Sequence, residues 1–138
     1  MSRRRLARAG LVAVVAIALT AATAIGSTGA GRATRGKGFS LSGHVTGLYP
    51  GQRKRLVIVV RNRGSRVLRV REVTTHVRDA SAACKARNLR IASFHGSLRV
   101  APHGWRRITV RASMRLDSPS ACQGAVFRLA FHGRATPG

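Results

Sequence analysis

The sequence predicts an all-β fold, and the observations that predict it all come after position 38. Short apolar runs recur there, separated by turn residues roughly every ten positions. Within most runs apolar and polar residues alternate, which is the period of a strand with one buried face. No window in this part has a helical period over three turns. About seven such strands in a hundred residues predict an Ig-like antiparallel β-sandwich, and an open barrel is the alternative.

The individual strands are predicted from their apolar pattern. The first alternates from Phe39 to Val45, and the β-branched run 56–60 suits a strand buried on both faces or a central sandwich strand. Within 68–77 the apolar residues change phase at Arg71-Glu72, which predicts a β-bulge. The remaining strands are expected at 89–94, where Phe94 marks the end, at 98–100, at 107–114 and at 125–132.

The first 24 residues have the three parts of a secretory signal peptide. Four arginines within residues 3–8 precede an apolar run at 11–25, and Ala22-Thr23-Ala24 is a small-residue cleavage site. The alternative, a membrane anchor, needs roughly 20 apolar residues and this run has about 15. We therefore expect a helical signal peptide at 1–24, a flexible linker at 25–37 and one domain at 38–134, with no transmembrane segment after cleavage. The protein is expected to be secreted, by either the general or the twin-arginine route.

The two cysteines, Cys84 and Cys122, predict one disulfide bridge. They are 38 positions apart and form no Cys-x-x-Cys pair, so a metal or redox pair is disfavoured. An even pair in an exported chain is typically oxidised. In the chain-entropy model a bridge of this span stabilises the fold by about 4 kcal/mol.

The charge of the chain is strongly one-sided. There are 26 Lys and Arg residues against 3 Asp and Glu, a formal net charge of +23. Such a charge attracts polyanions such as anionic cell-wall polymers, nucleic acids or acidic lipids. The alternative is a solvated basic surface, since a preference for Arg over Lys also follows from GC-rich coding. Most arginines are expected on the two outer faces of the sandwich.

The densest basic stretch is predicted to form a hairpin that could neutralise phosphates. Base stacking would need exposed aromatic rings, and only Tyr49 and Trp105 are candidates. No known nucleic-acid module fits, so we expect no specific nucleic-acid partner. The candidate polyanion-binding residues are Arg53, Lys54, Arg55, Arg61, Arg63, Arg66, Arg69 and Arg71.

Patterns for catalysis or metal binding are weak. The stretch 31–38 is close to a phosphate-binding loop, but Gly38 stands where the Ser or Thr is needed. A zinc site would require His95 and His103 to converge across a turn, and the only available carboxylate pair is Glu72 with Asp79. No Gly-x-Ser-x-Gly motif occurs. We expect no catalytic residues, no metal and no cofactor.

Several turn and strand signals resemble a known group of domains. Gly47-Leu48-Tyr49-Pro50-Gly51, the strand 56–60, Asn62-Arg63-Gly64-Ser65 and the strand 67–77 resemble Ig-like modules of the bacterial cell-adhesion-related type. The whole layout looks like small secreted proteins of actinobacteria. Trp105 lies too far after Cys84 to be the core tryptophan of true immunoglobulin domains, so we expect the bridge to tie two loops together.

This resemblance implies an exported, non-catalytic domain with a structural or adhesive role, and it carries no catalytic residues over to this chain. The high charge adds a further expectation, that the domain associates with the anionic cell envelope. The alternative function is a secreted effector that binds nucleic acid or acidic membranes.

Overall fold

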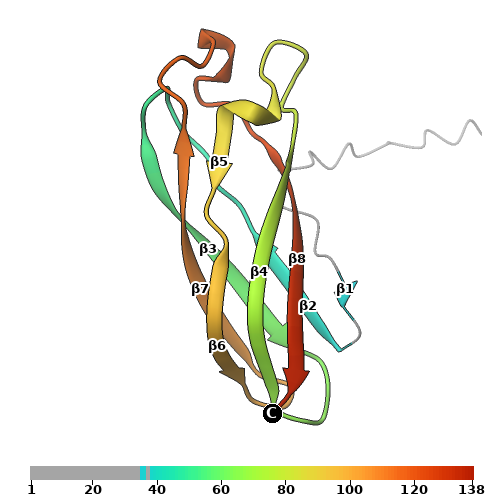
Figure 1. Cartoon of the computed structure of the whole chain (residues 1–138). Coiled ribbons are helices and arrows are strands. Elements are labelled where there is room, and N and C mark those ends of the chain that lie inside the picture. The colour runs from blue at the N-terminus through green and yellow to red at the C-terminus, as the bar shows by residue number, and fades with distance from the viewer. Residues whose placement is uncertain (1–34, 37) are drawn as a thin grey trace, which may run out of the picture.

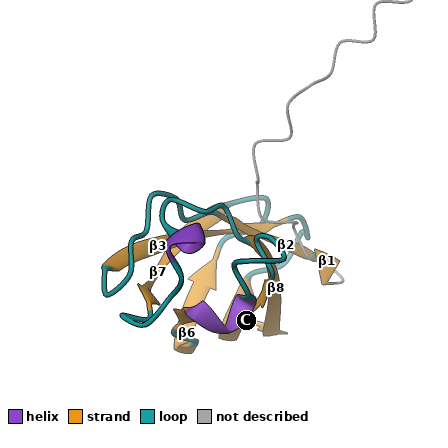
Figure 2. Ribbon diagram, turned by 90° about the horizontal axis from the view of Figure 1, so that it is seen from above, coloured by secondary structure: helices purple, strands orange, loops and turns teal. Residues whose placement is uncertain are grey.

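Two stacked antiparallel sheets form the protein in a computed structural model that describes residues 35, 36 and 38–138 (Figure 1). The predicted signal peptide at 1–24, most of the predicted linker and most of the loop-like stretch 31–38 lie outside the described residues. Seen from above, the sheets lie one over the other as two layers (Figure 2). The predicted all-β sandwich is confirmed.

The larger sheet has the strand order β1-β2-β3-β7-β5 and the smaller sheet the order β6-β4-β8, with every pair antiparallel. Apart from the two-residue β1, four strands face three, which is the strand count of an Ig-type sandwich. The larger sheet comprises β1 (Arg35–Gly36), β2 (Phe39–Gly43), β3 (Arg53–Asn62), β7 (Trp105–Met114) and β5 (Leu89–Ile91). The smaller sheet comprises β6 (Phe94–Val100), β4 (Leu68–Arg78) and β8 (Arg128–Pro137); the 3-10 turns are η1 (Ala86–Asn88) and η2 (Ser120–Cys122).

The core lies between the sheets and follows the predicted alternation. Along β3 and β7 alternate residues point inward and are removed from water, which stabilises the fold by about 1.5–3 kcal/mol for each large apolar side chain. Residues from the two layers meet in one cluster, which includes Leu41, Leu56, Ile58, Val60, Val70, Val73, Val100 and Phe131, all at most 1% exposed.

Of the two interpretations of 56–60, the central sandwich strand is confirmed and the strand buried on both faces is wrong. β3 is central in the larger sheet, between β2 and β7, but only one of its faces is covered. Val57 on the outer face is 42% exposed and Val59 is half-buried. A β-branched run therefore reflects the preference for the pleated backbone as much as burial.

The predicted strand with Leu89 and Ile91 is confirmed as β5, but the inclusion of Phe94 in it is wrong. The chain leaves the larger sheet after Ile91, and Phe94 begins β6 on the smaller sheet, which continues without a break to Val100. The exposed residues of β6, among them His95 and Gly96, lie on an edge strand and obscure its pattern. The predicted bulge in β4 is confirmed by a register shift between Val70 and Glu72.

The predicted disulfide is confirmed and it ties two loops, as expected. Cys84 lies in the loop 79–88 between β4 and β5, and Cys122 in the loop 115–127 between β7 and β8. Both sulfur-bearing residues are fully buried, with a Cα–Cα distance of 5.0 Å. The ordered strands extend past the predicted bounds, since β1 pairs within the expected linker and β8 ends at Pro137.

Candidate functional site

The predicted basic hairpin does not exist, because β3 and β4 belong to different sheets. The turn after Asn62 crosses from one layer to the other instead of pairing the two strands. The eight candidate residues are therefore divided. Arg53, Arg55 and Arg61 are exposed on β3, Arg63 and Arg66 lie in the crossing turn, and Arg69 and Arg71 lie on β4.

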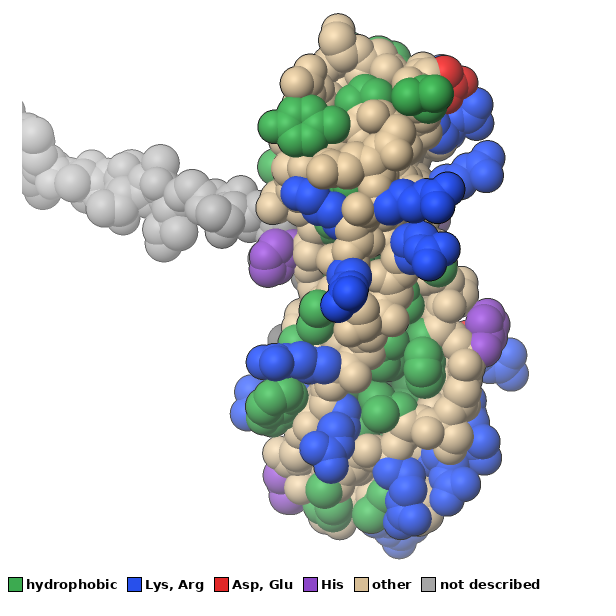
Figure 3. Space-filling model, turned by 90° about the vertical axis from the view of Figure 1, so that its left-hand side faces the viewer, with side chains coloured by type: hydrophobic (Ala, Val, Ile, Leu, Met, Phe, Trp, Pro, Cys, Tyr) green, Lys and Arg blue, Asp and Glu red, His purple; other side chains and the backbone are tan. Residues whose placement is uncertain are grey.

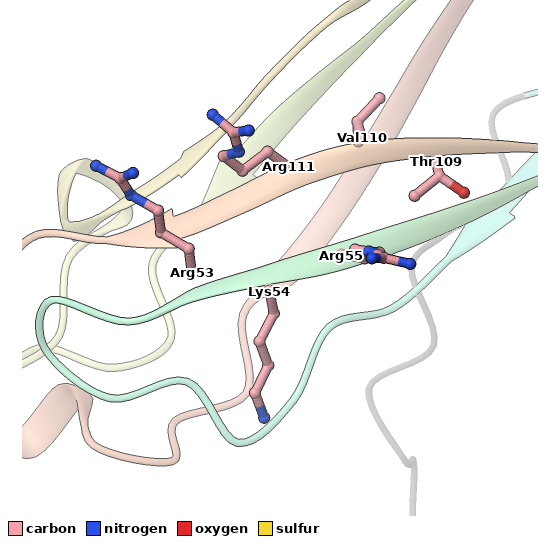
Figure 4. Close-up of a pocket in the computed structure, with 6 residues that line it drawn as sticks. All are labelled: Arg53, Lys54, Arg55, Thr109, Val110 and Arg111. Atoms are coloured by element: carbon pink, nitrogen blue, oxygen red, sulfur yellow. The ribbon is translucent and has the colours of Figure 1, made fainter.

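Lys54 is separated from its neighbours by the strand alternation. It is half-buried, and its Nζ donates a hydrogen bond to the carbonyl oxygen of Thr46 at 3.1 Å. Figure 4 shows its side chain extending away from those of Arg53 and Arg111. The ammonium group of Lys54 therefore points away from the guanidinium groups of the arginines beside it in sequence.

Four arginines come together on the outer face of the larger sheet, and we call Arg53, Arg55, Arg90 and Arg111 the arginine cluster. Arg55 pairs across the strands with Arg111, while Ser113 pairs with Arg53 on one side and Arg90 on the other. Neighbouring strands lie about 4.8 Å apart and every second residue about 6.8 Å along a strand, so the four side chains occupy one small area. A shallow hollow of about 350 Å³ lies beside three of them, along β3 and β7, and is lined by Arg53, Lys54, Arg55, Thr109, Val110 and Arg111 (Figure 4).

The cluster has no acidic partner on its own face. In the described part of the chain, no ion pair joins any of the four arginines to a carboxylate. Two arginines directly opposite each other in a sheet destabilise it. The cluster therefore holds positive charge that no ion pair in the described chain neutralises.

Asp117 borders the cluster from the loop after β7 but is engaged elsewhere. Its two carboxylate oxygens accept hydrogen bonds from Arg115 Nε at 2.8 Å and Arg115 Nη2 at 2.7 Å. These bonds hold the pKa of Asp117 below its ordinary value, and the nearby charge of Arg90 acts in the same direction. Asp117 thus stays ionised with Arg115 as its main partner.

The outer face of the smaller sheet is basic too, but it is organised differently. Arg78 lies opposite Arg128 at one end and Arg69 opposite Arg99 toward the other. Between these pairs lies Glu72, whose carboxylate is 3.7 Å from Arg134 and 4.0 Å from His95. The prediction that arginines occupy both outer faces is confirmed, and only the smaller sheet carries a carboxylate among them.

Trp105 lies on the outer surface at the start of β7, far from the disulfide. It is 54% exposed, and the guanidinium of Arg107 lies 5.1 Å from the ring centroid. This is a cation–π distance, and the flat ring remains accessible beside the charge. Tyr49, the other aromatic candidate, is also exposed. Trp105 is therefore not a core tryptophan, as its spacing from Cys84 indicated.

The residues considered for metal binding or catalysis do not lie close together in the fold. His95 lies near the start of β6 and His103 in the turn after its end, so most of a seven-residue strand separates them. Glu72 and Asp79 are likewise separated by the second half of β4. Asp79 accepts hydrogen bonds from Ala86 N at 2.7 Å and Lys85 Nζ at 3.2 Å, which lower its pKa. Across residues 35, 36 and 38–138 no group of three or more His, Cys, Asp or Glu could hold a metal ion.

Sequence reasoning missed two members of the cluster, Arg90 and Arg111. Arg111 lies at an outward position of a strand that the alternation predicts well, so its exposure could have been found. Its position opposite Arg55 could not, because strand order is set by contacts distant in sequence.

Comparison with known proteins adds no assignment to this surface. No protein-family model, curated protein or solved structure matches the chain. Within the part of the chain that the structure describes, no helix has the length and apolar character to span a membrane. What the protein binds must therefore be inferred from its own surface.

Proposed function

We propose that the protein is an exported, non-catalytic β-sandwich domain that binds anionic polymers of the cell envelope through the arginine cluster. The observation that carries this proposal is the convergence of four exposed arginines from three adjacent strands with no carboxylate on their face. A guanidinium presents a fork of donors that suits phosphate and carboxylate oxygens. The predicted signal peptide supports export, and the disulfide is compatible with an oxidising compartment.

The geometry favours an extended chain of repeated charges over a compact anion. The hollow is shallow, and the cluster spreads across three strands of an open sheet face. Further along the same face, Arg107 lies beyond Thr109 on β7, and Arg61 lies beyond Val57 and Val59 on β3. Four phosphate contacts by the cluster would give a slope of log K against log salt concentration of about −3.

Two matched double variants test the proposal. Arg55→Ser/Arg111→Ser removes the cross-strand pair of the cluster, and Arg78→Ser/Arg128→Ser removes the equivalent exposed pair on the smaller sheet. Both lose the same charge. Binding to poly(glycerol phosphate), followed by calorimetry over a range of salt, should weaken at least about tenfold in the first variant and lose about 1.5 from the salt slope. The second variant should bind nearly as well as the parent.

Equal weakening in the two variants would mean that net charge alone attracts the polymer, and the proposed site would be abandoned. Loss of folding is not a concern for the first variant, because it removes a like-charge pair whose members are both exposed.

Single-stranded nucleic acid is the second candidate ligand, and Trp105 is the observation that favours it. An exposed ring beside a guanidinium is a platform on which a base can stack. An oligonucleotide should then quench the fluorescence of Trp105 and lose affinity in Trp105→Ala, whereas poly(glycerol phosphate) has no base to stack. Quenching by neither polymer would leave the envelope polymer as the better candidate.

A further inference from the structure

Three exposed apolar side chains lie in loops at one end of the sandwich, remote from Trp105. Tyr49 lies in the loop between β2 and β3, and Leu116 and Val126 lie in the loop between β7 and β8. They are 47%, 82% and 46% exposed, and they are three of the five large exposed hydrophobic residues in the described chain. We call the loops 44–52, 79–88 and 115–127 the loop end; they lie together at the top of Figure 1.

The loops are held against one another rather than hanging free. Gly51 N donates to Met114 O at 3.1 Å, Gly124 N to Leu48 O at 2.9 Å, and Arg115 N to Asn88 O at 3.0 Å. The bridge between Cys84 and Cys122 links the second loop to the third. The apolar tips are therefore presented on a cross-linked platform.

Leu116 packs little against the rest of the protein, since most of its surface faces water. Exposed hydrophobic side chains that are grouped, unlike those scattered singly, mark a surface that contacts a partner or a membrane. Transfer of these side chains from water into an apolar medium would be favourable, and the folded protein alone does not bury them.

Arginines lie next to this end on both layers, and we call Arg53, Arg90, Arg78 and Arg128 the arginine belt. Arg53 begins β3 and Arg90 lies within the short β5 of the larger sheet, while Arg78 ends β4 and Arg128 begins β8 of the smaller sheet. Figure 3 shows hydrophobic side chains at the upper end of one side of the molecule and Lys and Arg side chains just below them. The two carboxylates at this end, Asp79 and Asp117, are hydrogen-bonded to Lys85 and Arg115.

We propose that the loop end docks on an anionic lipid bilayer, with Tyr49, Leu116 and Val126 inserted between the head groups and the arginine belt bound to lipid phosphates. Such a bilayer has an apolar interior covered by negatively charged head groups. In the docked state the apolar tips of the loop end would lie in the interior, and the guanidinium groups behind them would lie at the level of the head groups. A protein groove could take the apolar tips, but it gives no reason for unpaired positive charge on both layers. The strands then stand away from the membrane, with Trp105 at the far end.

This docking does not rest on the envelope-polymer proposal. The inserted side chains are absent from the arginine cluster, and only Arg53 and Arg90 belong to both surfaces. The two proposals can therefore fail separately.

Single tryptophans at either end report the orientation. Trp105→Phe/Tyr49→Trp and Trp105→Phe/Leu116→Trp place the fluorophore in the loop end, while the parent keeps it roughly 30 Å away at the other end of β7. On vesicles of equal parts phosphatidylglycerol and phosphatidylcholine, we expect a blue shift and quenching by bromine-labelled acyl chains in both loop-end reporters. The parent Trp105 should show neither, and pure phosphatidylcholine vesicles should bind far more weakly.

Leu116→Ser tests the contribution of insertion, and Val57→Ser is its matched control on the open sheet face. Leu116→Ser should weaken vesicle binding roughly 10- to 100-fold, whereas Val57→Ser should leave it unchanged. Leu116→Ser should also retain poly(glycerol phosphate) binding, which separates the two surfaces. A blue shift at Trp105 instead of the loop-end reporters, or equal vesicle binding by Leu116→Ser and the parent, would overturn the proposal.

Discussion

Asn62 is a buried polar residue that joins the two layers at the end of β3. Its side chain is 2% exposed, and its Nδ2 donates to the carbonyl oxygens of Arg66, Val100 and Ala101 at 2.8, 3.2 and 3.0 Å. Its Oδ1 accepts from Gly64 N at 2.9 Å. One side chain thus satisfies backbone groups in the crossing turn and at the end of β6, where the chain turns toward β7.

The exchange Asn62→Asp should lower the free energy of unfolding by about 3 kcal/mol. It replaces the donor with an acceptor that faces three carbonyl oxygens, and it buries a charge without a partner. Chemical denaturation at neutral pH measures the change. Ser65→Asp, which adds the same charge at an exposed position of the same turn, should change stability by less than about 0.5 kcal/mol. Similar losses in the two variants would show that Asn62 has no special role.

At the scale of elements, the disulfide determines how firmly the loop end is held. The two bridged loops, 79–88 and 115–127, each have only a three-residue 3-10 turn as regular secondary structure. Their conformation therefore depends on the hydrogen bonds between loops and on the bridge. The double variant Cys84→Ala/Cys122→Ala should lose up to about 4 kcal/mol in stability, and the reduced parent should behave in the same way. A thermal or denaturant midpoint that reduction leaves unchanged would contradict this.

Much of the element structure could be predicted, because alternation is a local property. β7 and β8 were predictable from residues such as Ile108, Val110 and Leu129, which are buried at every second position. β6 was not, because it is an edge strand in which only Val100 is fully buried. The crossing between β3 and β4 was not predictable either. A short turn between two apolar runs suits a hairpin and a layer crossing equally well, and distant partners decide between them.

At the scale of the whole molecule, the net charge can be calculated from the sequence, but the arrangement of the charges on the surface cannot. A formal net charge of +23 predicts attraction to polyanions and nothing about where they bind. The folded chain distributes arginines over both outer faces, yet only the larger sheet gathers Arg53, Arg55, Arg90 and Arg111 without a carboxylate. Residues brought together from three strands cannot be recognised as one site before the strand order is known.

The most direct test of the proposed function is residue-resolved NMR of the folded domain titrated with poly(glycerol phosphate). We predict that backbone amide shifts change along β3, β7 and β5, with the largest changes near Arg55, Arg90 and Arg111. The amides of β4, β6 and β8 should change little at the same polymer concentration. Changes of equal size on both sheets, or changes confined to the smaller sheet, would contradict a binding surface on the larger one.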